Sequence, residues 1–311
     1  MTHVEALNLD HVPEHLIVIG GGYVALELGH AMRRFGSRVT ILERGPQIVA
    51  QEDPDVAREL QRLLRNDGVD ILLETQPLLV NGTSGQHVSL NLKSPSGTQT
   101  LDATDILVAT GRIANTDSLN LAKAGVEVDG RGYIRVNERL QTRAPNIWAM
   151  GDCAGSPHFT HVALDDFRIV RDNLNGKNRT TSGRLIPFCI FTDPELARVG
   201  LNESQAKKAG IDYRLLKIPM AAVLRTRTLS ETNGFLKALI AARDDQILGF
   251  TALGTQAGEL MAVVQTAMMA KLPYTALRDA IFAHPTMAEG LNVLFNAVPA
   301  VQTETSTQAA A

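Results

Sequence analysis

The hydrophobic pattern of the first hundred residues alternates between short apolar runs and helical spacing. His15 to Ile19 is a continuous apolar run, which is typical of a buried parallel strand. Behind it an amphipathic helix is predicted up to Phe35, ended by Gly36, with apolar residues at Val24, Leu28, Met32 and Phe35. Arg38 to Leu42 then repeats the strand pattern. The order strand, helix, strand indicates a parallel α/β fold.

The same alternation continues to residue 111. Asp53-Pro54 predicts the start of a helix, Gly68 its end, and the spacing of its apolar residues gives a buried face of Val56, Leu60, Leu63 and Leu64. Residues 69–73 are predicted to form a strand, 78–102 an antiparallel meander, and 105–111 a returning buried strand. Together these segments predict one α/β domain.

The pattern changes after residue 113. We expect a hairpin at Asp129-Gly130 and an apolar strand at 147–152 ending in Asp152, followed by a helix at 163–174 and a polar link at 175–183. A third region is predicted to contain strands and then helices, and the last residues, 299–311, are predicted to be disordered. The strands are predicted at 187–191, 213–218, 235–242 and 246–253, and the helices near 256–271 and 286–296.

Composition and charge narrow the class of protein. The chain has 311 residues, enough for two or three domains, and 44% of them are hydrophobic. A net charge of −3 argues against nucleic acid as a partner, and no apolar run is long enough to span a membrane. Neither a secretory signal nor a disulfide framework is visible, since Cys153 and Cys189 are the only cysteines. We therefore expect a cytoplasmic protein.

The turn after the first strand has the pattern of a dinucleotide-binding loop. Gly20 allows a tight turn, Gly22 lets a pyrophosphate approach the backbone, and Ala25 lets the helix pack closely on the strand. The N-terminus of the following helix attracts a phosphate. Glu43 ends the second strand, where an acid can bind ribose hydroxyls. The alternative is a glycine turn without a ligand.

Four sequence blocks follow one another along the chain: Gly20-Gly-Gly-Tyr-Val-Ala-Leu-Glu27, Ala109-Thr-Gly-Arg112, Met150-Gly-Asp152 and His284-Pro-Thr-Met-Ala-Glu289. Together they resemble the pyridine nucleotide–disulfide oxidoreductases, the family of dihydrolipoamide dehydrogenase, glutathione reductase and mercuric reductase. Their order and spacing fit the family from about residue 12 to residue 296, and the segment 163–174 is most similar to bacterial mercuric-reductase-like members.

This resemblance implies an α/β protein with three parts. They are an NAD(P)H-binding domain at 12–113, the C-terminal part of an FAD-binding domain at 114–183, and an α+β dimerisation domain at 184–298. Family members begin with an FAD-binding domain that carries its own glycine fingerprint and a Cys-x4-Cys redox disulfide, neither of which this sequence contains. We therefore expect a truncated or fragmentary chain that is inactive alone, or a natural short form with a separate partner.

The resemblance also assigns cofactor roles near the first fingerprint. By resemblance, the NAD(P)H pyrophosphate is bound by Gly20, Gly21, Gly22, Tyr23, Val24 and Ala25. Glu27 lies near the nicotinamide in the family, and Gly111 near the cofactor ribose, although Gly111 is equally well explained as a turn glycine. Glu43 favours NADH modestly, because a carboxylate repels the 2′-phosphate of NADPH, while the adjacent Arg44 can pair with that phosphate.

A second set of residues matches the flavin site. By resemblance, Asp152 binds the ribityl chain of FAD with Gly151 leaving room beside it, and Phe159, Thr160 and His161 lie against the flavin at a helix N-terminus. The alternatives are a capping Asp and a structural His. A metal site at Cys153, His158 and His161 is disfavoured for want of a fourth ligand.

His284 and Glu289 carry the acid–base chemistry in the family. There the histidine moves a proton to or from the substrate thiol, the glutamate orients its ring, and the pair acts across a homodimer interface. Without the other blocks these residues would be an ordinary loop histidine and a glutamate at the start of a helix. We therefore predict a dimeric flavoprotein that passes hydride from NAD(P)H to FAD and on to a disulfide, metal ion or similar acceptor. The alternative is a non-catalytic nucleotide-binding and dimerisation module.

Overall fold

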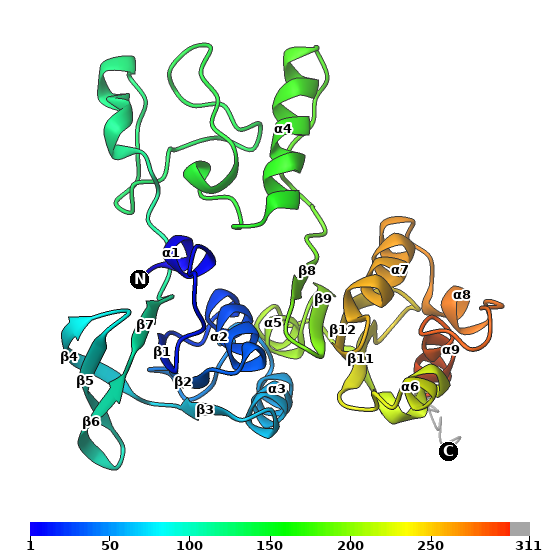
Figure 1. Ribbon diagram of the computed structural model, residues 1–311. Coiled ribbons are helices and arrows are strands. Elements are labelled where there is room, and N and C mark those ends of the chain that lie inside the picture. The colour runs from blue at the N-terminus through cyan, green and yellow to red at the C-terminus, as the bar shows by residue number, and fades with distance from the viewer. Residues whose placement is uncertain (299–311) are drawn as a thin grey trace, which may run out of the picture. The chain divides into compact units, whose positions relative to one another are not determined.

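The computed structural model describes residues 1–298, which form two compact units (Figure 1). The first unit combines residues 1–110 with residues 187–298, and the second is Gly111–Ile186. The first unit is therefore assembled from two segments that are far apart in the sequence. The tail predicted to be disordered, 299–311, lies outside the described residues.

A four-stranded parallel sheet forms the centre of the first segment, in the order β3-β2-β1-β7. It consists of β1 (His15–Ile19), β2 (Arg38–Leu42), β3 (Val69–Leu72) and β7 (Asp105–Val108). Ile17 in β1 pairs with Thr40 on one side and Ile106 on the other. The strand is buried on both faces, which explains its unbroken apolar sequence. The predicted parallel α/β fold is confirmed.

Two helices pack on this sheet, α2 (Tyr23–Phe35) and α3 (Pro54–Asn66), and a short helix, α1 (His3–Leu7), precedes β1. The predicted buried face of α3 is confirmed. That of α2 is right only in part: Leu28 and Met32 are half-buried against the core, but Phe35 is 68% exposed. The fully buried residues are Ala25, Leu26, Gly29 and His30. Small residues explain the difference: a Cβ on Gly29 would lie only 3.4 Å from Ile41, so the helix approaches the sheet along this side.

The predicted meander is a three-stranded antiparallel sheet. Its strands are β4 (Gln76–Thr83), β5 (His87–Ser94) and β6 (Gly97–Ala103). Val88, Leu90 and Leu92 of β5 alternate inward into a small core with Ile17 and Ile106 of the parallel sheet. This packing confirms the alternation read from the sequence.

The second segment of the first unit is built on a five-stranded antiparallel sheet in the order β10-β11-β12-β9-β8. The four predicted strands are present, but β9 and the short helices α5, α6 and α8 were not predicted. The strands are β8 (Phe188–Ile190), β9 (Glu195–Gly200), β10 (Tyr213–Pro219), β11 (Phe235–Ala241) and β12 (Ile247–Gly254). The helices are α5 (Glu203–Lys208), α6 (Leu224–Leu229), α7 (Ala257–Met269), α8 (Tyr274–Arg278) and α9 (Gly290–Asn296).

The second unit contains little regular structure apart from α4 (Thr160–Leu174) and three 3₁₀ turns, η1 (Asp117–Leu119), η2 (Leu121–Ala124) and η3 (Gly151–Ala154). The hairpin at Asp129-Gly130 is present, closed by a bridge between Val128 and Ile134. The strand predicted at 147–152 is wrong. Only Trp148 makes a bridge there, and Gly151, at φ 70°, turns the chain into η3.

Across residues 1–298, no helix has both the length and the apolar character needed to cross a lipid bilayer.

Candidate dinucleotide and redox site

The glycine loop after β1 combines a crowded turn with an open one. Gly20 has φ 115°, and a Cβ there would lie 2.6 Å from the carbonyl oxygen of Ala109. Gly22, which precedes α2, would place a Cβ in space with no heavy atom within 4 Å. Ala25 is fully buried in the first turn of α2, next to the half-buried Tyr23 and Val24. Because first-turn N–H groups have no acceptor inside a helix, this open space suits an anionic group.

Glu43 is fixed against the glycine loop. Its Oε2 accepts the N–H of Gly21 at 2.8 Å, and its Oε1 accepts the N–H of Gly45 at 2.6 Å. Each carboxylate oxygen has a second lone pair, so both can still accept hydroxyl donors. The acid at the end of β2 and the loop after β1 therefore form one site, with Arg44 exposed beside it.

Glu27 lies one turn further along α2 and faces the second segment of the first unit. Its Oε1 accepts the backbone N–H of Phe191 at 2.8 Å. Burial raises the pKa of the Glu27 carboxyl, and the hydrogen bond from Phe191 offsets part of this effect. The residue thus joins α2 to the segment that follows β8.

In the second unit, Asp152 lies in η3 and pairs with Arg112, whose Nη1 is 3.0 Å from Oδ2. The side chain of Asp166, in α4, holds this turn. Asp166 was not singled out from the sequence. Its Oδ2 accepts the N–H of Gly151 at 2.8 Å, and its Oδ1 pairs with Arg184 at 2.6 Å. Asp166 is fully buried, so it fixes the backbone next to Asp152.

The remaining residues of this unit that were predicted to bind a cofactor lie at two places. Gly111 is exposed at φ 134°, directly before Arg112. Phe159 and His161 stack with ring centroids 5.2 Å apart on either side of Thr160, the first residue of α4. Asp152 and the start of α4 thus belong to the same compact unit.

His284 and Glu289 meet in the loop before α9. Nδ1 of His284 lies 3.1 Å from Oε1 of Glu289, whose Oε2 accepts the N–H of Thr286 at 3.0 Å. The histidine side chain is 65% exposed, whereas that of Glu289 is 19% exposed. With Nδ1 held by the carboxylate, Nε2 is the ring nitrogen presented for proton exchange.

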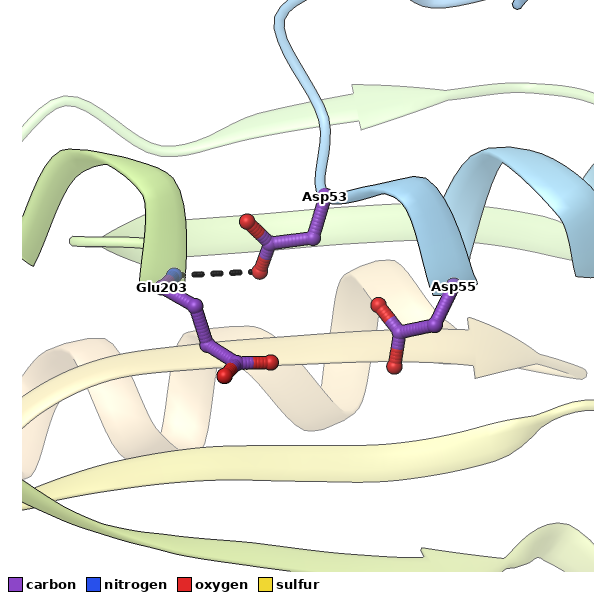
Figure 2. A group of neighbouring side chains, drawn as sticks. All are labelled: Asp53, Asp55 and Glu203. Atoms are coloured by element: carbon purple, nitrogen blue, oxygen red, sulfur yellow. Dashed lines mark hydrogen bonds between the residues drawn. The ribbon is translucent and has the colours of Figure 1, made fainter. Parts of the chain in front are cut away.

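A cluster of three carboxylates lies where the two segments of the first unit meet (Figure 2). Oxygens of Asp53, Asp55 and Glu203 all lie within 4.8 Å of one another, a spacing that suits a cation. The side chain of Lys237 supplies that cation: Nζ lies 2.9 Å from Asp53, 2.9 Å from Asp55 and 2.6 Å from Glu203. We call these four residues the Lys237 cluster.

The Lys237 cluster places one ammonium among three carboxylates. Burial by itself lowers the pKa of Lys237, but hydrogen bonds to Glu203, Asp55 and Asp53 outweigh burial and raise the pKa overall. Asp53 also accepts the N–H groups of Glu203 and Ser204, so it caps α5 rather than its own helix, α3. No sequence pattern indicates this cluster, because its members are distant in the chain.

Both cysteines are free thiols. Burial, aided by the nearby carboxylates of Glu195, Glu27 and Glu259, raises the pKa of Cys189 to about 12. Cys189 is therefore a protonated, unreactive thiol at neutral pH.

Comparison with known families identifies this arrangement. Residues 1–166 match the model of the pyridine nucleotide-disulphide oxidoreductase family, and residues 186–294 match that of its dimerisation domain. The chain belongs to this family. Members of the family use FAD and NAD(P)H. The second segment of the first unit is thus the family's dimerisation domain.

Individual relatives agree with the family match. The chain is 41% identical over 294 residues to a probable pyridine nucleotide-disulfide oxidoreductase, RclA, of Escherichia coli, a match that covers 94% of this chain and 66% of the relative. It is 38% identical to a dihydrolipoyl dehydrogenase of Thermus scotoductus, covering 90% of this chain and 61% of the relative. The chain therefore spans less than two thirds of the length of these curated relatives.

A solved structure shows the same fold. The HOCl-induced flavoprotein disulfide reductase RclA from Escherichia coli superposes with a TM-score of 0.90 at 40% identity, covering 96% of this chain and 68% of that chain.

Proposed function

We propose that this chain forms the NAD(P)H-binding and dimerisation parts of an FAD-dependent oxidoreductase. In this proposal, hydride passes from the nicotinamide to FAD and on to a disulfide, a metal ion or a similar acceptor. The observation that carries the proposal is the open space at Gly22, at the start of α2, beside a carboxylate fixed by the same loop. Family membership supports it independently.

Different residues of the first unit bind different parts of the nicotinamide cofactor. The loop from Gly20 to Ala25 takes the pyrophosphate, and Glu43 accepts the ribose hydroxyls. Because both oxygens of Glu43 are already aligned by N–H donors, a 2′-phosphate would come close to a fixed negative charge. We therefore favour NADH over NADPH, with Arg44 reducing the difference. Glu27 lies beside the nicotinamide.

The residues of the second unit fit one side of a flavin site. FAD, when bound, supplies the hydride-accepting ring. Asp152, oriented by Arg112, accepts ribityl hydroxyls, and Gly151 keeps that turn free of a side chain. Phe159, Thr160 and His161 bring the N-terminus of α4 to the ring.

Proton transfer at the acceptor falls to the histidine pair. Glu289 holds Nδ1 of His284, which leaves Nε2 to give or take the proton in a homodimer built by the dimerisation domain.

The low reactivity of Cys189 favours one alternative, a non-catalytic module. Burial raises the pKa of Cys189 to about 12, so at neutral pH Cys189 stays a protonated thiol and is a poor nucleophile for disulfide exchange. The chain would then be a non-catalytic nucleotide-binding and dimerisation module that needs a separate FAD-domain partner. The two functions differ in whether this chain holds flavin.

The first test is the absorption spectrum and flavin content of the purified chain, followed by titration with NADH. One FAD per chain that is bleached by NADH supports the oxidoreductase. A colourless protein that binds NADH supports the module. A chain that binds neither cofactor refutes both.

A glycine variant locates the nucleotide. Gly22→Ala is expected to weaken NADH binding at least about tenfold, because its Cβ would occupy space next to the pyrophosphate. Gly22 has φ −83° and ψ 176°, which alanine adopts freely, so the fold should be unchanged. Gly130→Ala is the matched control, since a Cβ at Gly130 also meets no atom within 4 Å. Equal NADH affinity of the two variants would exclude the glycine loop as the pyrophosphate site.

A further inference from the structure

A strained residue lies next to the proposed dinucleotide site. Val49, in the loop between β2 and α3, has φ 43°, the left-handed region that β-branched residues strongly avoid. It is buried at 7% exposure and packs in the main core of the first unit. Such a conformation persists only where the surrounding contacts enforce it. Val49 has backbone hydrogen bonds on both sides. One set joins it to the glycine loop, and the other holds its left-handed conformation.

On one side, Val49 holds the glycine loop. Its N–H donates to the carbonyl oxygen of Gly21 at 2.8 Å. The N–H of the same glycine donates to Glu43. Both backbone polar groups of Gly21 are therefore bound by the segment 43–49, and the left-handed turn at Val49 is what aims its N–H at the loop.

On the other side, Val49 is held by Glu52. The N–H of Glu52 donates to the carbonyl oxygen of Val49 at 2.8 Å. Its carboxylate forms a bidentate pair with Arg198 of β9, with Nε–Oε2 2.9 Å and Nη2–Oε1 3.0 Å. Both side chains are buried, at 9% and 2% exposure for Arg198 and Glu52 respectively.

Arg198 is itself anchored within the dimerisation domain. Nη1 donates to the carbonyl oxygen of Gly200 at 2.9 Å and to Oε1 of Gln205 at 3.2 Å. Its guanidinium lies over the ring of Phe188, 4.8 Å from the centroid. A second link runs in parallel, since the side-chain amide of Asn202 donates to the carbonyl oxygen of Gln51 at 2.8 Å.

We infer that Arg198 is a positioning residue for the dinucleotide. Through Glu52 it keeps Val49 in its strained conformation, and through Val49 it fixes the glycine loop that receives the pyrophosphate. The inference rests on the proposed function, because it assumes that the loop binds NAD(P)H. It adds that nucleotide affinity depends on a residue of the dimerisation domain, 146 positions away from Glu52 in the sequence.

The test measures NADH affinity of the full chain in four forms: wild type, Arg198→Met, Val49→Gly and the double variant. Arg198→Met is expected to weaken NADH binding about tenfold, which is about 1.4 kcal/mol, because Val49 relaxes and moves Gly21. Glycine adopts φ 43° without strain, so Val49→Gly should bind within about threefold of wild type. In the Val49→Gly background the loop no longer depends on the Glu52–Arg198 pair, and adding Arg198→Met should weaken NADH binding less than about threefold.

Two further variants separate positioning from loss of stability. Arg214→Met removes an arginine of the same sheet that is bound to Asp245 and lies over Tyr274, both within the dimerisation domain, and it should leave NADH affinity unchanged. The double variant Glu52→Gln, Arg198→Met avoids an unpaired buried charge and should still show the weaker binding.

The outcomes distinguish a failure of the positioning role of Arg198 from a failure of the proposed function. The positioning role is overturned if the fold-losses of NADH affinity in Arg198→Met and Val49→Gly simply multiply in the double variant. It is also overturned if Arg214→Met loses as much NADH affinity as Arg198→Met. In both cases the proposed function stands. A wild-type chain that binds no NADH overturns the proposed function and this inference with it.

Discussion

Replacing Lys237 with methionine is the sharpest test of how the first unit is held together. The side chain of Lys237 is 1% exposed, and its ammonium contacts three carboxylates from both segments. Methionine keeps most of the aliphatic volume and removes only the charge. The variant therefore leaves Asp53, Asp55 and Glu203 together without their common cation.

The cost of this change follows from the partners that remain. Removing one member of a buried ion pair typically costs about 3–5 kcal/mol, because the other charge is left uncompensated. Here Asp55 keeps Lys217 at 2.6 Å, Glu203 keeps the hydroxyl of Tyr213 at 2.9 Å, and Asp53 keeps its hydrogen bonds to α5. We therefore expect a loss near the lower end, about 3 kcal/mol of unfolding free energy.

Urea denaturation measures this loss. With a slope of about 3 kcal/mol per molar urea, the midpoint should fall by about 1 M. Lys217→Met is the matched control: Lys217 is the cross-strand neighbour of Lys237 but is 37% exposed and contacts one carboxylate, so we expect at most about 1 kcal/mol. If both variants lose the same stability, or if Lys237→Met loses none, the ammonium does not hold the segments together.

The carboxylates left behind offer a second readout. In Lys237→Ala the ammonium and its stem are gone, while three carboxylates remain at a spacing that suits Ca²⁺. Added Ca²⁺ should raise the urea midpoint of this variant, by about 2.7 kcal/mol in unfolding free energy at a hundredfold excess over Kd, and chelation should reverse it. Wild type should not respond. A calcium effect of the same size in wild type would mean that Lys237 is not the resident cation.

Two further predictions concern acid and local stability. Burial raises the pKa of Asp53 and Asp55, but hydrogen bonds outweigh it and lower both pKa values. Asp53 accepts them from Lys237, Ser204 and Glu203, and Asp55 accepts them from Lys217 and Lys237. The stabilisation by both carboxylates is therefore present above the unfolded pKa of about 3.9 and is lost as the pH falls further. The urea midpoint of the wild type should therefore decrease as the pH is lowered below about 4. The midpoint of Lys237→Met should decrease less over the same pH range. An equal pH dependence of the two midpoints would contradict this. Asp166→Ala removes a charged acceptor from Gly151, so hydrogen exchange at that amide should speed up about 10- to 100-fold, whereas unchanged exchange would show that η3 is held by other contacts.

Local features of the sequence predicted the parallel sheet and the geometry of the glycine loop. Each depends on neighbouring residues: an apolar run buried on two faces makes β1, and the absence of a Cβ permits the turn at Gly20. Such features can be read from a short window of sequence. The pairing of His284 with Glu289 spans only five positions, but it was expected from the family resemblance and not from a local pattern.

Features that depend on distant partners could not be read in this way. The strand β9 contains Glu195 and Arg198, which break its apolar pattern, and the burial of Arg198 makes sense only with Glu52 in place. Asp53 was expected to cap the helix that it precedes, yet its side chain caps α5 instead. In both cases the polar residue is explained by a contact across about 150 positions of sequence.

The Lys237 cluster also sets an order of events during synthesis. Asp55 and Lys237 are 182 positions apart, so at roughly 5–20 residues per second the lysine leaves the ribosome about 10–40 s after Asp53 and Asp55. Until then Asp53 and Asp55 can remain hydrated, which costs little. Desolvation of all four charged groups must wait for the later segment to dock. Completion of the first unit is therefore a late folding step, and its timing is set by translation.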